Sequence, residues 1–194
     1  KLSIVNKLIS IYMAKRQVFY SFHFRNDCWR AGQVKNMGVI DGNTPVSANE
    51  WEEVKRKGKG AIERWINNSM AYRSCVVVLI GSETANREWC NYEIKHAWEE
   101  GKGIVGIYIH GLEDAIGKQD KKGANPLSNF CIDKTFNYIA QRSVPQDSNE
   151  VNLSKVCKAY DTPFISSKYV YNYIKDNIDK WCEEAIRIRN QYPK

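Results

Sequence analysis

Two apolar runs separated by a helical pattern are the clearest feature of the hydrophobic and polar positions. Residues 75–80 (CVVVLI) and 104–109 (IVGIYI) lack any polar residue that alternates with the apolar ones. A strand of this kind is buried on both faces, as in a parallel sheet covered by helices. Between the runs, residues 86–100 carry apolar residues at helical spacing. The three segments therefore predict a βαβ unit, whose crossover is right-handed.

Three further strands have weaker signals. Residues 17–22 (QVFYSF) are rich in aromatic and β-branched residues, which is typical of a strand. Residues 38–40 predict a short second strand that ends in a loop at 41–45. A last short strand is expected near 156–160. The segment 111–145 contains several glycines and mixed charge, so it is expected to be rich in loops.

Polar residues with the spacing of helix caps precede three helical patterns: Asn26-Asp27, Ser47 with Glu50, and Ser166 or Ser167. After the second cap, glycines interrupt the helix and the pattern resumes over 61–70. After the third cap, one apolar stripe is typical of a helix packed on a sheet. It consists of Tyr171, Ile174, Ile178, Trp181, Ala185 and Ile188.

These elements predict an α/β fold with about five mostly parallel strands and helices on both faces. In such a fold a ligand binds beyond the carboxyl ends of the strands, where the strand order reverses. The residues expected there follow the first, second and third strands: Ser21, Phe22 and His23, then Asp41 to Thr44, then Gly81 to Thr84.

The length of 194 residues corresponds to one ordinary domain. Residues 1–12 are largely apolar, and Met13-Ala14-Lys15-Arg16 resembles a natural start. We therefore expect an N-terminal extension or cloning remnant over 1–12 and a single domain over 13–194. No apolar stretch approaches the roughly 20 residues of a membrane helix. No small-x-small cleavage site follows the first segment, so neither a membrane span nor a signal peptide is predicted.

The chain is basic, with 29 Lys and Arg against 22 Asp and Glu and a net charge of +7. This balance permits binding to nucleic acid, anionic lipid or phosphorylated ligands, but requires none of them. The densest basic run is 55–59 (KRKGK). No aromatic residues interleave with it, which disfavours a nucleic-acid partner. A solvated helix end is the preferred interpretation.

The six cysteines lie outside any CxxC pair, and the three histidines are far apart in the sequence. The spacing typical of zinc sites is therefore absent, and no metal is expected. Several cysteines fall in apolar segments, as small buried hydrophobic residues do. Together with the missing secretion signal, this predicts reduced thiols and a cytoplasmic protein. The even number of cysteines leaves a disulfide-bonded alternative open.

A GxGxxG match at 101–106 has the wrong context for a dinucleotide fingerprint, which follows a strand and opens a helix. Here the match closes a helix and enters a strand. Gly101 is therefore expected to end the helix and Gly106 to allow close packing. Walker A and GxSxG sequences are absent as well. The first strand lacks the acidic pair with which a phosphate-receiver domain binds a divalent cation.

The most informative segment is 82–100, with its sequence Trp89-Cys90-Asn91-Tyr92-Glu93. On a helix, Glu93 lies beside the apolar face, and Trp89 lies one turn before it. A carboxylate at the edge of an aromatic wall is partly desolvated, which raises its pKa and strengthens its interaction with a cation. The alternative is an ordinary surface glutamate beside a packed tryptophan.

The first strand (VFYSF), the apolar third strand ending in Gly81-Ser82, and the WCxxE pattern at 89–93 together resemble TIR domains. The resemblance is closer to the TIR-like proteins of bacterial Thoeris anti-phage defence. Shared segments include 13–16 (MAKR), 21–23 (SFH), 78–82 (VLIGS), 92–94 (YEI) and 125–126 (NP). The resemblance covers roughly residues 13–127 and implies a flavodoxin-like TIR fold.

The resemblance also implies a function. In enzymatic TIR domains the glutamate of this helix cleaves NAD at the nicotinamide–ribose bond, which makes Glu93 the expected catalytic residue. Trp89 would then stack on the substrate, and His23 would lie near the nucleotide. Ser21, Phe22, Asp41 and Ser82 are the other substrate-binding candidates. NAD is expected as a substrate, and no separate cofactor is expected. In defence TIR proteins a hydroxyl of the ADP-ribose can close a ring and give a cyclic signal.

Two competing functions remain at this stage. The chain could be a non-catalytic signalling module that acts through TIR–TIR contacts or a downstream effector protein. It could also be a basic domain that binds phosphate groups or nucleic acid. Glu93 with Trp89 favours the enzyme over the module, because a scaffold needs neither in a crevice. The animal adaptor signature is absent from the loop after the second strand, and the long segment 111–145 also differs from those adaptors.

Overall fold

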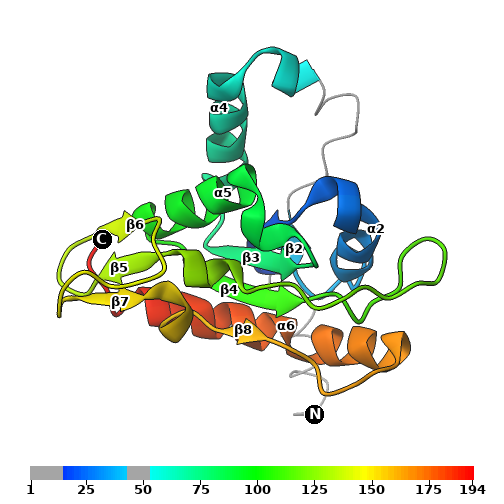
Figure 1. The fold of residues 1–194 in the computed structure, drawn as a ribbon. Helices are drawn as coiled ribbons and strands as arrows, with labels where there is room; N and C mark the ends of the chain where they lie inside the picture. Colours follow the sequence, from blue (N-terminus) through cyan, green and yellow to red (C-terminus); the bar gives the residue numbers. More distant parts are fainter. Residues whose placement is uncertain (1–14, 43–52) are drawn as a thin grey trace, which may run out of the picture.

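The computed structural model describes residues 15–42 and 53–194, and its centre is a five-stranded sheet (Figure 1). Every strand pair in this sheet is parallel, and the strand order is β2-β1-β3-β4-β8. This is the order 2-1-3-4-5 of flavodoxin-like folds. The strands are β1 (Gln17–Ser21), β2 (Asp41–Gly42), β3 (Cys75–Ile80), β4 (Gly103–Tyr108) and β8 (Ala159–Tyr160). The structure thus confirms the predicted α/β fold and the adjacent, parallel first and third strands.

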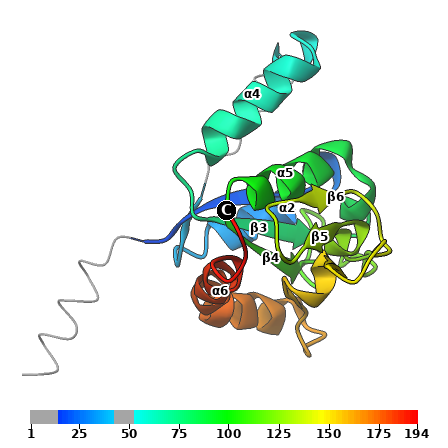
Figure 2. The ribbon, with the colours of Figure 1, turned by 90° about the vertical axis from the view of Figure 1, so that its left-hand side faces the viewer.

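Helices cover both faces of the sheet. On one face, α2 (Phe24–Lys35) and α6 (Ser167–Arg189) pack on one apolar cluster. On the other face, α4 (Lys59–Met70) and α5 (Glu88–Glu99) pack on a second cluster. Figure 2 shows α4 projecting from the body, and its buried residues are confined to Ile62, Ile66 and Met70.

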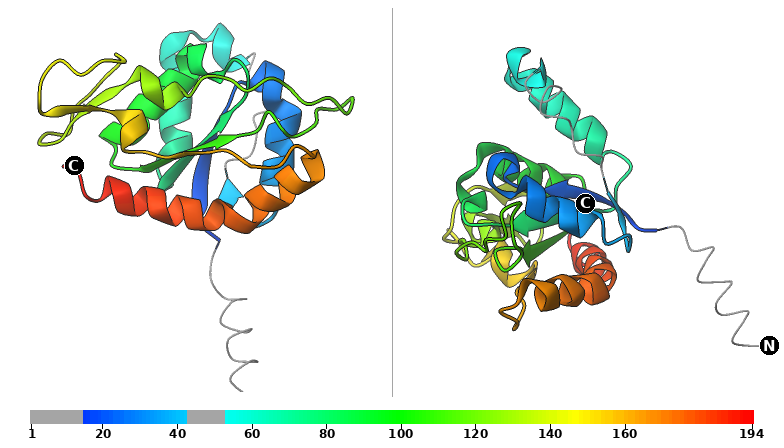
Figure 3. Two further views of the ribbon diagram at one scale, coloured as in Figure 1. Left: turned by 60° about the horizontal axis from the view of Figure 1, so that its bottom comes forward. Right: turned by 90° about the vertical axis from the view of Figure 1, so that its right-hand side faces the viewer.

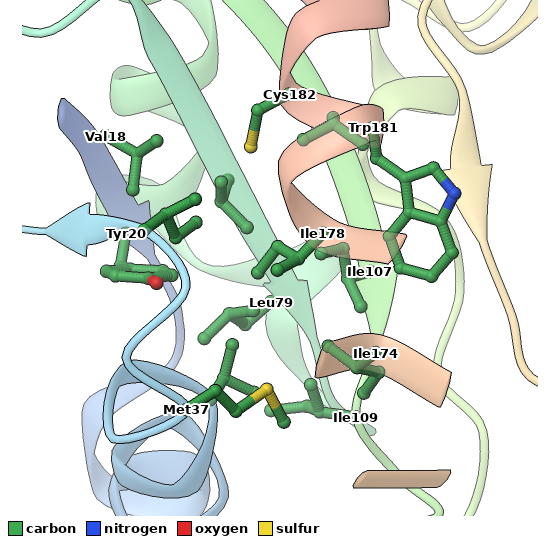
Figure 4. Packing of buried hydrophobic residues seen from close by; sticks show 14 of the residues in the cluster. Val18, Tyr20, Met37, Leu79, Ile107, Ile109, Ile174, Ile178, Trp181 and Cys182 are labelled. Carbon is green, nitrogen blue, oxygen red and sulfur yellow. The ribbon is translucent and has the colours of Figure 1, made fainter. Parts of the chain in front are cut away.

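The cluster beneath α6 is formed by one stripe of that helix and the strands it crosses (Figure 4). Ile174, Ile178 and Trp181 are buried, as the helical spacing predicts. The ring of Trp181 stacks on Tyr160 of β8 at 4.4 Å between centroids. This contact fixes the short edge strand to α6.

The apolar strands β3 and β4 are buried along their whole length, which confirms their predicted place inside the sheet. A Cβ at Gly106 would lie 2.8 Å from the Ile80 side chain and 2.9 Å from that of Ala159. Gly101 follows α5 with a φ of 70°, a conformation that glycine adopts without strain. Gly101 and Gly106 of the GxGxxG match therefore have the structural roles expected of them.

Two local predictions near the N-terminal end are wrong. The second strand is Asp41–Gly42 instead of 38–40, because Gly38 adopts a φ of 70° and turns the chain first. Asn26-Asp27 does not cap α2, which already begins at Phe24 with His23 as its N-cap residue. The predicted capping box at 47–50 and the segment 1–12 lie outside the described residues.

The segment after β4 was expected to be mostly loop, but it contributes to a second sheet. This antiparallel sheet has the order β6-β5-β7, with β5 (Cys131–Asp133), β6 (Ile139–Ala140) and β7 (Glu150–Asn152). Short 3₁₀ helices accompany it: η2 (Pro126–Asn129), η3 (Leu153–Lys155) and, before α5, η1 (Thr84–Asn86). Figures 1 and 3 show the second sheet at one end of the central sheet and the loop that follows β4 at the other.

Arg189 joins α6, α5 and the second sheet. Its side chain is fully buried and donates two hydrogen bonds to the carbonyl of Trp98, of 2.8 and 3.1 Å. A third bond reaches Asn137 Oδ1 at 3.0 Å, and others reach the carbonyls of Tyr192 and Pro193. The guanidinium also lies 4.3 Å from the Trp98 ring centroid. One buried charge therefore holds three parts of the chain together.

In the described part of the chain, no helix is long and apolar enough to cross a membrane. All six cysteines are free thiols, of which Cys28 is exposed and the other five are buried.

Candidate active site

The candidate site lies where β1 and β3 end, next to each other in the sheet. Here the strand order reverses, because β1 leads back to β2 on one side while β3 leads to β4 on the other. This is the position at which doubly wound sheets bind ligands. Ser21 is the last residue of β1, and α5 passes over the same edge with Glu93 on its buried side.

Glu93 is only 8% exposed despite its carboxyl group. Burial raises the pKa of this carboxyl to about 8, and the neighbouring Ser21 hydroxyl and Lys35 ammonium oppose the rise. A carboxyl with such a pKa changes its charge near neutral pH, which is a property of catalytic acids and bases. The structure thus brings Glu93 and Ser21 together, as the predicted site requires.

The Ser21 side chain lies between two groups of α5. It is fully buried, and its Oγ makes no hydrogen bond within 3.5 Å among the described residues. It is still near enough to the Glu93 carboxyl and the Cys90 thiol to lower the pKa of both. Burial dominates at Cys90 and raises the pKa of its thiol far above the usual value. Cys90 is therefore a neutral neighbour of Glu93.

Lys35 also lies at the end of β1, and no sequence pattern singled it out. It comes from the last turn of α2, and its ammonium lies 4.7 Å from the ring centroid of Phe22 and 5.4 Å from that of Tyr20. Burial lowers the pKa of Lys35 to about 8, and the Glu93 carboxyl opposes that shift.

His23 and Phe22 continue from β1 into α2. The Nδ1 atom of His23 lies 3.7 Å from a carboxylate oxygen of Glu83, at the end of β3. Burial, with the positive charge of Arg87, lowers the pKa of His23. The imidazole is therefore predominantly neutral at pH 7. Phe22 lies against Phe24, with 6.3 Å between ring centroids.

Ser82 fastens the loop after β4 to the site. Its hydroxyl donates a 2.6 Å hydrogen bond to Asp120 and accepts one of 3.1 Å from the amide of Asn26. Nearby, Gly123 packs so closely on the Gly81 carbonyl that a Cβ would clash with it. The predicted substrate-binding residue Ser82 thus has a structural role in this arrangement.

Asp27 is a second buried carboxyl at this edge that the sequence did not reveal. Burial raises its pKa to about 6, and Arg30, 3.5 Å away, opposes the rise. The carboxylate packs directly against Gly81, where no Cβ would fit. Arg30 also donates hydrogen bonds of 2.9 Å to the carbonyls of Leu112 and Lys118, so it ties the same loop to α2.

Two predicted substrate-binding residues, Trp89 and Asp41, have surroundings unlike those of Ser21, Phe22 and His23. Trp89 is half-buried and has Tyr92 6.0 Å away and the Lys59 ammonium 5.9 Å away. Asp41 was predicted to follow the second strand, but it begins β2 and pairs with Gln17 at the opposite end of β1 from Ser21. The predicted position of Asp41 beside the crevice is therefore wrong.

The side chains around Glu93 suit the stabilisation of a cation. An ionised carboxylate in a site that excludes water stabilises positive charge far more than it does in bulk water. Within residues 15–42 and 53–194, no three His, Cys, Asp or Glu side chains lie close enough together to hold a metal ion. The described residues thus offer a carboxyl, a hydroxyl and an ammonium for chemistry at this edge.

Comparison with known proteins finds similarity over the part of the chain that contains this site. Residues 19–114 match the family model described as "Thoeris protein ThsB, TIR-like domain". Over 120 residues the chain is 40% identical to a protein of Bacillus cereus (strain MSX-D12) named "Putative cyclic ADP-D-ribose synthase ThsB1". The match covers 59% of this chain and 62% of the length of that relative. Ser21, Lys35 and Glu93 all fall within the residues matched by the family model. Residues 19–114 of this chain are thus similar to the TIR-like domain of Thoeris ThsB proteins.

Proposed function

We propose that this protein cleaves NAD at the bond between nicotinamide and ribose and joins the ADP-ribose into a cyclic product that acts as a signal in anti-phage defence. The observation that carries the proposal is the buried carboxyl of Glu93 beside Ser21, where β1 and β3 end. The name of the Bacillus cereus relative supports the product class.

Glu93 has the central role in the proposed chemistry. When the C1′–N bond breaks, nicotinamide leaves with the electron pair of that bond, and positive charge develops on the ribose. A carboxylate beside this carbon stabilises the charge, as in glycosyl transfer. A hydroxyl of the same ADP-ribose then attacks C1′, and its proton passes to a base or to water. Attack by water gives linear ADP-ribose instead.

The protonation of Glu93 sets the pH range of this reaction. With a pKa of about 8, the free protein holds the carboxyl mostly neutral at pH 7. The ionised form is the one that stabilises a cation, so we expect the NAD cleavage rate to rise with pH between about 6 and 9. His23 is not expected to limit the reaction above pH 7, because burial lowers its pKa and the imidazole is mainly neutral there.

The test is incubation of the protein with NAD at high protein concentration, followed by mass analysis of the products. Glu93→Gln keeps the size of the side chain and removes its charge. The variant should lose about two decades in rate or more, which corresponds to several kcal/mol of transition-state stabilisation. Glu99→Gln, an exposed position on the same helix, should leave the rate unchanged.

The same comparison separates the enzyme from a non-catalytic signalling module. Equal NAD turnover by active wild-type protein and folded Glu93→Gln would remove Glu93 from the mechanism. Absence of turnover under every condition, including addition of lysate from phage-infected cells, would favour a module that works through TIR–TIR contacts or a downstream effector.

A further inference from the structure

Lys59, the first residue of α4, places its charge over an aromatic ring of α5. Its Nζ atom lies 5.9 Å from the ring centroid of Trp89 and donates a 2.7 Å hydrogen bond to Glu88 Oε1. Glu88 and Trp89 both belong to the first turn of α5. The Trp89 ring thus has a cation over it, at a distance within the reach of a cation–π interaction.

The charge of Lys59 does little for the stability of the fold. The N-terminal turn of a helix disfavours positive charge, and that turn of α4 has no acidic residue to offset it. The side chain of Lys59 is 65% exposed, and that of its partner Glu88 is 64% exposed. An exposed ion pair of this kind adds little to the free energy of unfolding. The contact between Lys59 and Trp89 is therefore not a requirement of the fold.

The ring of Trp89 is held next to Glu93 by contacts other than Lys59. Trp89 and Glu93 are one turn apart on α5, so their side chains are neighbours on the helix surface. Tyr92 meets the Trp89 ring edge-on, with 6.0 Å between the ring centroids, and its hydroxyl donates a 3.0 Å hydrogen bond to Asn67 of α4. A group that lies on the Trp89 ring is therefore within one helical turn of Glu93.

The nicotinamide ring of the proposed substrate is itself a cation. While it is bonded to ribose, this pyridinium ring carries one positive charge, and it becomes neutral when it leaves with the electron pair of the C1′–N bond. A planar aromatic cation interacts with an indole face both by stacking and through its charge. Two positive charges over the same ring repel each other. The Lys59 ammonium and a pyridinium ring therefore compete for one place.

We propose that Lys59 occupies the cation position over Trp89 until the pyridinium ring of NAD displaces it, so that Lys59 sets the affinity for the substrate by competing with it. The consequence for turnover rests on the proposed NAD cleavage, whereas the competition can be measured with a pyridinium cation that is not cleaved. Displacement requires only a change in the Lys59 side chain, because the buried residues of α4 begin one turn later, at Ile62.

The first experiment measures the binding of 1-methylnicotinamide, a pyridinium cation without ribose, by isothermal titration calorimetry. Lys59→Gln should bind this cation about two- to fivefold more tightly than wild-type protein does, because the competing ammonium is gone. The control is Lys57→Gln, which removes a charge two residues away that pairs with Glu53 instead. Neutral nicotinamide should bind equally to all three proteins.

Three outcomes of this titration would overturn the proposal. The first is unchanged or weaker binding of 1-methylnicotinamide to Lys59→Gln. The second is an equal gain in Lys59→Gln and Lys57→Gln, which would reflect the net charge of the protein alone. The third is the absence of binding to every protein.

Two further variants locate the gain on the ring. Lys59→Gln also frees the carboxylate of Glu88, which attracts a cation without any contribution from Trp89. The gain should persist when Glu88→Gln is added to Lys59→Gln, and it should disappear when Trp89→Leu is added. The reverse result would assign the gain to Glu88 and contradict the proposal. If the variant with Trp89→Leu does not fold, the comparison with Glu88→Gln still decides.

The kinetics of NAD cleavage distinguish a competitor from a residue that binds the substrate. Lys59→Gln should lower the KM for NAD about two- to fivefold and leave kcat near the wild-type value. A higher KM would show that this ammonium binds the phosphate groups of NAD, and the proposal would be wrong. If wild-type protein has no activity, the proposed function fails, and the titration with 1-methylnicotinamide still decides the role of Lys59.

Discussion

Two buried ionisable groups lie along helix α5, and their surroundings differ. Near its C-terminal end, the carbonyl of Trp98 accepts hydrogen bonds from Arg189, whose guanidinium reaches four acceptor groups in all. Near its middle, α5 itself carries Glu93, a buried carboxyl whose pKa burial raises to about 8. The helix thus contacts one charge that is well satisfied by hydrogen bonds and carries one group whose charged form is disfavoured by burial.

The difference indicates what each region is for. A buried charge with all its hydrogen bonds made fixes the parts of a structure that surround it. A buried charge that lacks them reduces stability, and such groups are concentrated at functional sites. The Arg189 region therefore stabilises the fold. The Glu93 region lowers the free energy of unfolding, as functional sites often do.

The largest effect is expected at the Arg189 region. Arg189→Met keeps an apolar stem but leaves the Trp98 carbonyl and Asn137 without their donor, so the free energy of unfolding should fall by about 3 kcal/mol. Urea denaturation would measure this. The control is Arg187→Met at an exposed position of the same helix. Similar losses in the two variants would contradict the role assigned to Arg189.

Substitution of Glu93 is expected to change the free energy of unfolding in the opposite direction. Its pKa is about 4.5 in the unfolded chain and about 8 in the folded protein, so the folded state binds the proton more tightly. Wild-type stability therefore falls as the pH rises from 4.5 to 8, whereas Glu93→Gln lacks this pH dependence. The variant should be more stable by about 2 kcal/mol at pH 8, because burial of its amide offsets part of the gain.

Denaturation at pH 4 and pH 8 provides the measurement for Glu93→Gln. The difference from wild type should be small at pH 4, where the carboxyl is protonated in both states. A variant that is less stable than wild type at pH 8 would show that Glu93 is a structural residue like Arg189.

A smaller effect is expected from the loop fastened by Ser82. Ser82→Ala removes the donor to Asp120 and should lower the free energy of unfolding by about 1 kcal/mol. Hydrogen exchange in residues 111–123 should speed up, because the loop loses one of its attachments. Ser82→Thr, which keeps the hydroxyl, should behave as wild type. Unchanged exchange in Ser82→Ala would mean that the other attachments, such as those of Arg30 and Gln33, hold the loop without it.

The cysteines report on local opening without any substitution. In native protein a thiol reagent should modify Cys28 first, because the other five are buried. If the Glu93 region opens more readily than the rest, Cys90 should react next, ahead of Cys75 and Cys182 in the core beneath α6. Simultaneous reaction of the five buried thiols would show that the two regions open together. All six should react in denaturant.

The sequence predicted the elements whose pattern is set locally. The two apolar strands, the α6 stripe and the glycine after α5 each follow from spacing within one segment, and all are confirmed. The second sheet was missed because its strands are two or three residues long, too short for any alternation to be visible. Asp41 was misplaced because a turn at Gly38 delays the strand.

The candidate site was predictable only in part. Glu93 could be singled out because its helix carries a recognisable pattern next to Trp89. Lys35 and Asp27 could not, because neither lies in a recognisable motif and their burial is set by the folded structure. Nothing in the sequence around Lys35 distinguishes it from an ordinary solvated lysine at the end of a helix. The catalytic role of Glu93 and the substrate contacts of Ser21, Phe22, His23, Trp89 and Ser82 stay predictions.

The position of α6 determines when this protein can complete its fold during synthesis. The apolar face formed by Val18, Leu79 and Ile107 is covered by the last long helix of the described chain, and Arg189 at its end bonds to Trp98, 91 residues earlier. While the ribosome is still making residues before 189, that face lacks the cover of α6 and is covered only in part by α2. Nascent chains that already contain β4 but not α6 therefore expose part of an apolar sheet face, which is the situation in which chaperones bind.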